Sequence, residues 1–341
     1  MAGSQAVKRA PQKLAPQFPQ EGELVSQIKA ALTAAKSLTA QNASERAALR
    51  QAGLAQRSPI IQANQRAAER LLASLVEKSG FDSGKFEEIQ AQNRTEVLRI
   101  LEAQRAEAAK DATEAIASFR SAVSSRRKII EGLAASTGTQ VVLDSPFLIW
   151  PQPPTTDLFF DDYRIEPWNS WAKFKIDSTN SATDTVNFYF LWQNSSDQYV
   201  VINVDSWLML AGACRVDIPG HWYEYEYSSI NNIYAQLSLL EWWNQPPTTP
   251  AAQADQIQEV LSFPLFIEKG VLGSFLSPQS EGVFRTRDLR YNVELVPPQG
   301  VVVIEVGASI RFQNDNGGVE ADFDSGNFQV MCPFVQIQIM L

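Results

Sequence analysis

The densest set of side chains that could do chemistry lies between residues 221 and 227. Three tyrosines there, Tyr223, Tyr225 and Tyr227, alternate with glutamates. Side chains of a β-strand point alternately to its two faces, so the tyrosines share one face and the glutamates the other. A row of three aromatic rings stacks on sugar rings, fills a protein interface or forms the core face of its strand. We favour the core face, with the glutamates in solvent.

A second aromatic feature is the adjacent pair Trp242 and Trp243, which precedes a proline-rich segment. Neighbouring residues of a strand point to opposite faces, so one of these rings lies outside the core unless a further layer covers it. This pair is our best candidate for a contact surface. The predicted surface comprises Trp242, Trp243, Tyr223, Tyr225 and Tyr227.

The residues needed for catalysis do not form a recognisable set. His221 is the only histidine, and no Gly-x-Ser-x-Gly motif provides a nucleophile. Acidic residues cluster around 157–166, but paired catalytic carboxylates must face each other across a cleft, which spacing alone does not establish. No phosphate-binding loop or dinucleotide fingerprint is present. We therefore predict a non-enzyme with no catalytic residues and no cofactor.

Metal binding is not expected either. Cys214, Cys332 and His221 are too few to complete a zinc site. The aspartates near 315–324 do not follow a calcium-loop pattern. Both cysteines lie in apolar, strand-like runs, which predicts buried free thiols, although a disulfide between them remains an alternative.

The chain divides into two halves of different composition. Residues 1–140 carry a net charge of +6 and residues 141–341 a net charge of −15, and every Trp and Tyr follows residue 140. The basic residues of the first half alternate with glutamates, as on a solvated helix, and the acidic second half repels phosphates. We therefore expect no nucleic-acid partner.

The first half is predicted to be helical. After an arm at 1–20, helical patterns cover about 21–54 and 58–78, and a long helix covers about 83–135. The long helix has an apolar stripe with a mean spacing of about 3.6 residues, and it would form a rod of about 75 Å. Such a stripe needs a partner, which is either the first two helices or another copy of the chain. The predicted helical interface comprises Ile89, Val97, Ile100, Ala108, Ala112 and Phe119.

The second half is predicted to be all β. Eight runs rich in β-branched and aromatic residues are separated by Asn, Asp, Gly and Pro, with one short helical turn near 252–260. The predicted fold is an α+β multidomain chain in which a long α-helical bundle or stalk precedes a jelly-roll-like β-sandwich. The predicted divisions are the arm at 1–20, the stalk at 21–138, a proline-rich linker with edge strands at 139–167 and an antiparallel sandwich at 168–341.

Three functions fit this layout, and we favour the first. The first is a structural protein that oligomerises through its helices and displays the sandwich for protein or glycan contact. The second is a pore-forming toxin with a receptor-binding sandwich, although charges recur every few residues in the helices. The third is a lectin-like binding protein. No signal peptide or membrane span is apparent, so we expect cytoplasmic synthesis, with release as part of an assembly as one route outside the cell.

Overall fold

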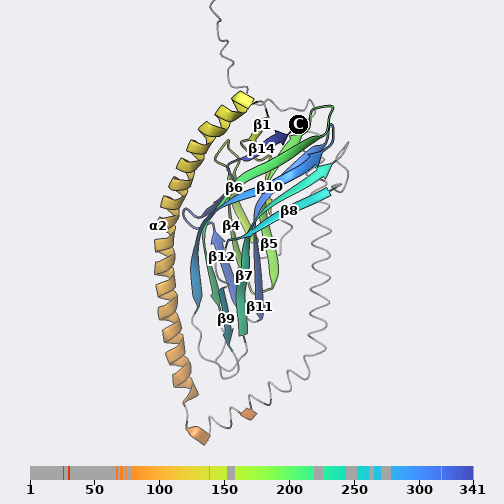
Figure 1. Cartoon of the computed structure of the whole chain (residues 1–341). Helices are drawn as coiled ribbons and strands as arrows, with labels where there is room; N and C mark the ends of the chain where they lie inside the picture. Colours follow the sequence, from red (N-terminus) through yellow and green to blue (C-terminus); the bar gives the residue numbers. More distant parts are fainter. Residues whose placement is uncertain are drawn as a thin grey trace, which may run out of the picture.

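A computed structural model describes residues 82–137, 139–151, 158–218, 226–242, 252–260, 265–269, 278–315 and 317–340, with a few single positions between 26 and 80. Most of these residues lie in two antiparallel sheets, and one long helix, α2 (Ser83–Thr137), crosses the outside of one sheet (Figure 1).

In the described part of the chain, the larger sheet contains eight strands, built around the long strand β6. They are β1 (Gln140–Leu143), β3 (Leu158–Arg164), β4 (Trp171–Ser178), β6 (Val200–Asp217), β10 (Gln279–Val296), β12 (Gly318–Phe323), β13 (Gln329–Met331) and β14 (Val335–Met340). One edge of β6 pairs in turn with β14, β13 and β12, and the other edge pairs with β10. Among the described residues, β10 pairs with no other strand.

The smaller sheet contains six strands among the residues that the structure describes. They are β2 (Leu148–Pro151), β5 (Ala182–Gln193), β7 (Glu226–Trp242), β8 (Ala252–Glu259), β9 (Leu265–Lys269) and β11 (Val301–Asp315). Apolar side chains from both sheets form the main core between them, with Phe188, Phe190 and Val306 on one side and Ile202, Val204 and Leu208 on the other. The predicted β-sandwich is confirmed.

Strand β6 is buried on both faces, because α2 covers the face that points away from the core. Trp207, Met209 and Ala211 alternate with core residues and meet a second apolar cluster that includes Phe119 and Ile116 of α2. This burial explains why the run from Trp207 to Cys214 is continuously apolar.

The start of α2 agrees with the sequence pattern. Asp82 caps the helix, since its Oδ1 accepts a hydrogen bond of 3.0 Å from the backbone N–H of Lys85. The helix then runs antiparallel to β6: Arg94 lies beside Asp217, and Phe119 lies beside Trp207.

The predicted fold class, a helical bundle or stalk followed by a sandwich, is wrong. Within the described residues the structure is mostly β-sheet, with one helix of about fifty residues that packs along the sandwich. The partner of the apolar stripe is neither the first two helices nor another copy, as predicted, but the sheet of the same chain. Residues 21–78 lie almost wholly outside the described residues.

Two local predictions also differ from the structure. The segment near 252–260, predicted as a helical turn, is strand β8, which pairs with β7. Strands β3 and β12 were not predicted; each is short and carries acidic residues that pattern analysis assigns to loops. The division into domains stays a prediction, although β1, β2 and β3 pair within the two sheets.

Candidate functional site

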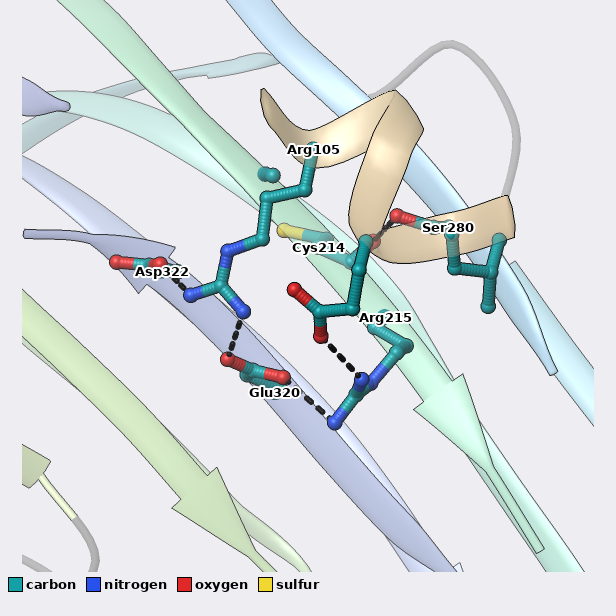
Figure 2. A pocket seen from close by; sticks show the side chains of 9 residues that line it. Arg105, Cys214, Arg215, Ser280, Glu320 and Asp322 are labelled. Carbon is teal, nitrogen blue, oxygen red and sulfur yellow. Dashed lines mark hydrogen bonds and ion pairs between the residues drawn. The ribbon is translucent and has the colours of Figure 1, made fainter. Parts of the chain in front are cut away.

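Ion pairs in a cluster of charged side chains join the N-terminal half of α2 to the larger sheet (Figure 2). Arg105 of α2 forms ion pairs with Asp322 and with Glu320, the latter at 2.9 Å from Nη1 to Oε1. Arg215 of β6 and Lys175 of β4 contact the same Glu320 carboxylate at 2.8 and 3.0 Å. Glu320 is therefore held by three cations from three elements.

The electrostatics of this cluster favour the charged carboxylates. Burial raises the pKa of Glu320, but the hydrogen bond from Lys175 and the charges of Arg215 and Arg105 outweigh it, and the pKa lies below its ordinary value. Burial likewise raises the pKa of Asp322, and hydrogen bonds from Ser325 and Asp324 with the charge of Arg105 lower it overall.

This cluster joins α2 to the sheet and does not form a ligand site. The cavity among Leu101, Arg105, Cys214 and Glu320 measures only about 10 Å³. A buried water needs about that much room, so the cavity has no space for a larger molecule.

A much larger groove lies farther along the same helix, between α2 and β10. Its volume is about 500 Å³, within the range of about 300–1,000 Å³ that small-molecule sites occupy. The residues that line it are Ala115, Ser118, Phe119 and Ala122 of α2, Trp207 and Met209 of β6, and Phe284, Arg285, Thr286 and Asp288 of β10. We call it the α2–β10 groove.

The groove combines an aromatic floor with a polar rim. Trp207 is half-buried, with its ring 6.2 Å from that of Phe119 and 5.7 Å from that of Phe334. Thr286 and Asp288 pair in register with Met209 and Trp207, so their exposed side chains share the face of the sheet that α2 covers. Small residues on α2, such as Ala115 and Ser118, leave the space open.

Charged residues surround Trp207 at one end of the groove. The guanidinium of Arg126 lies 5.8 Å from the centre of the Trp207 ring. Arg290 forms ion pairs with Asp288 at 2.7 Å and with Asp205 at 3.1 Å. Burial raises the pKa of Asp205, and the charge of Arg290 only partly opposes that shift.

The predicted aromatic surface is only partly described. Tyr223, Tyr225 and Trp243 lie outside the described residues. Tyr227 is half-buried in β7, in register with Asp315 of β11, and Trp242 pairs with Val301 at the other end of β7. The contact role of these residues stays a prediction.

The predicted helical interface is divided between two environments. Ala112 and Phe119 are buried against the sheet, Val97 and Ala108 are half-buried, and Ile89 and Ile100 are exposed. Ala108 and Ala112 belong to the cluster that contains Ala211 and Ala213 of β6. The small residues therefore admit the sheet of the same chain, and oligomerisation stays a prediction.

The residues of the α2–β10 groove were missed by sequence analysis. A signal was available, because Asp205, Trp207 and Met209 alternate in one strand and must share a face. Nothing in the sequence indicated that Phe119 and Asp288 would meet that face, since three separate elements supply these residues.

The remaining predictions concern thiols, metals and membranes. Cys214 and Cys332 are free and buried, as predicted, and burial raises the pKa of the Cys332 thiol to about 12. In the described part of the chain, no three His, Cys, Asp or Glu residues gather into a metal-binding group. Among the described helical residues, none form a helix long and apolar enough to cross a membrane.

No protein-family model and no curated protein matches this chain. Solved structures that match include a carbohydrate-binding module in complex with β-1,4-galactotriose, with 6% identity, a TM-score of 0.19, and coverage of 60% of this chain and 84% of that one. A module that recognises mannan has 12% identity, a TM-score of 0.20, and coverage of 58% and 98%. At these TM-scores the likeness bears on neither ligand nor mechanism.

Proposed function

We propose that this chain is a non-catalytic binding protein that takes a carbohydrate in the α2–β10 groove. The observation that carries the proposal is the half-buried Trp207 ring in a groove of about 500 Å³ that Ser118, Thr286 and Asp288 also line. A sugar presents an apolar ring face and a rim of hydroxyls, which match an aromatic floor and a polar edge.

The polar rim supplies the hydrogen-bonding groups that such a ligand needs. Ser118 and Thr286 each offer a hydroxyl, which donates and accepts, and Asp288 offers a carboxylate, which accepts. Asp288 is already oriented by Arg290, whose Nη2 donates to its Oδ2 at 2.7 Å. This pairing reduces the flexibility that a ligand would otherwise have to restrain.

The first experiment obstructs the groove from the helix. Ser118 is exposed and lines the groove, so Ser118→Trp should fill it while leaving α2 folded. Ser124, exposed on the same helix and not part of the lining, provides the matched control Ser124→Trp. We expect the wild type and the control to bind neutral oligosaccharides on a glycan array and Ser118→Trp to bind none.

A second pair of variants tests the rim. Thr286→Val and Asp288→Asn each remove one hydrogen-bonding function from an exposed side chain, and each should lower affinity about tenfold in isothermal titration calorimetry. A wild-type protein that binds no oligosaccharide, or binding that survives Ser118→Trp, would overturn the proposal.

A further inference from the structure

We propose that Arg126 and Gln336 form a subsite beside Trp207 that takes a neutral hydroxyl group of the bound molecule. This inference rests on the proposed carbohydrate-binding function of the α2–β10 groove, and it specifies one group of the ligand and the two side chains that hold it.

Arg126 supplies a donor that has no acceptor. It lies one helical turn beyond Ala122, which lines the groove, and its guanidinium stacks at 5.8 Å on the Trp207 ring. Its Nε–H is buried and has no hydrogen-bond partner in the described part of the chain. A buried donor without a partner is destabilising, and an acceptor on a bound molecule would remove that cost.

Gln336 supplies an acceptor that has no donor. The residue lies in β14 and is 7% exposed. Its Nε2 donates to Gln140 Oε1 at 3.0 Å, but its own Oε1 is buried and, within the described residues, receives no hydrogen bond.

Asp205 of β6 connects the two side chains. It is the cross-strand neighbour of Gln336, so both side chains lie on the face of the sheet that α2 covers. Arg126 lies against the ring of Trp207, which is two residues from Asp205 in β6 and points to the same face of the sheet. The unpaired donor and acceptor therefore belong to one patch of the sheet, next to Trp207.

The chemistry of this patch selects a hydroxyl. A hydroxyl accepts one hydrogen bond and donates another, whereas a carboxylate only accepts and an ammonium group only donates. A carboxylate could accept from Arg126, but it has no hydrogen to donate to the buried Oε1 of Gln336 and would set two acceptors against each other. We therefore expect neutral sugars to bind better than their uronic-acid counterparts.

The test uses calorimetry with cellotriose, mannotriose and β-1,4-galactotriose, and with a monodeoxy series of whichever trisaccharide binds. Arg126→Met and Gln336→Met should each weaken binding about tenfold, and the double variant should bind no worse than the weaker single variant, because both side chains hold one hydroxyl. One monodeoxy ligand should bind the wild type about tenfold more weakly than the parent trisaccharide does. The same ligand and the parent trisaccharide should bind the double variant with equal affinity. Gln338→Met, an exposed change in the same strand, is the matched control and should bind normally.

Stability separates this role from a structural one. Methionine at both positions removes the penalty of burying two unpaired polar groups but also the Gln336–Gln140 hydrogen bond. The two effects should nearly offset, so the double variant should unfold at about the same urea concentration as the wild type. Lost stability with lost binding would overturn the subsite. Normal trisaccharide binding by both single variants would also overturn it while leaving the groove proposal intact. Absence of any trisaccharide binding by the wild type would overturn both proposals.

Discussion

Arg105 Nη1 lies 2.9 Å from Glu320 Oε1, and this ion pair joins α2 to β12. The Glu320 side chain is 8% exposed and that of Arg105 is 23% exposed, so both charges lie largely out of water. Paired buried charges contribute little to stability compared with apolar residues, but removing one partner leaves the other uncompensated.

Removing the Arg105 charge should therefore destabilise the fold. Arg105→Met leaves Asp322 without its cation, while Glu320 keeps Lys175 and Arg215. We expect the free energy of unfolding in urea to fall by about 2–4 kcal/mol. Arg99→Met is the control, because the Arg99–Glu96 pair on the same helix is exposed and should change stability by less than about 0.5 kcal/mol. Equal effects of the two variants would contradict this account of the cluster.

Acid should weaken the same cluster. The pKa values of Glu320 and Asp322 are lowered on folding from ordinary values of 4.5 and 3.8. Their stabilising contribution is thus complete above about pH 5 and is lost as the pH falls through 4.5 and 3.8 towards the folded-state values. Urea unfolding at pH 7, 5, 4 and 3 should show this loss, and Glu320→Gln should flatten the dependence below pH 5. An unchanged slope in that variant would show that other groups control acid unfolding.

Close packing of α2 on β6 should be sensitive to side-chain size. Ala112 has no exposed surface and belongs to the cluster that contains Ala211 and Ala213. Ala112→Leu adds volume to this packed contact and should destabilise the protein by about 1–3 kcal/mol. The exposed Ala117 on the same helix provides the control Ala117→Leu, which should be nearly neutral in thermal denaturation. A neutral Ala112→Leu would mean that α2 does not pack tightly there.

Replacing two glycines by alanine should change the stability of the fold in opposite directions. A Cβ on Gly307 of β11 would lie 1.9 Å from Asn187 Oδ1 and 2.6 Å from the Val186 carbonyl oxygen, so Gly307→Ala should destabilise the fold by about 2 kcal/mol or more. Gly132 in α2 has no atom within 4 Å of such a Cβ, and Gly132→Ala should stabilise the helix by up to about 1 kcal/mol. Relative to the wild type, the melting temperature should therefore fall for Gly307→Ala and rise for Gly132→Ala.

Much of the secondary structure could be predicted because its signals are local. The spacing of Phe119, Ile130 and their neighbours marks α2, whose bounds of Ser83–Thr137 lie close to the predicted 83–135. Alternation of apolar and polar residues marks β14. The short acidic strands β3 and β12 lack both signals, since their pairing is set by neighbouring strands.

The sequence by itself determined where the helix lies, that its apolar face needs a partner, and that the second half forms sheets. Only the tertiary structure decided that the partner is β6 and that Trp207, Phe119 and Asp288 enclose a groove. The physical reason is that a periodic pattern specifies the face an element buries but not the surface that covers it. Contacts such as that of Arg105 with Glu320 join distant parts of the chain, and the local sequence around either residue does not indicate them.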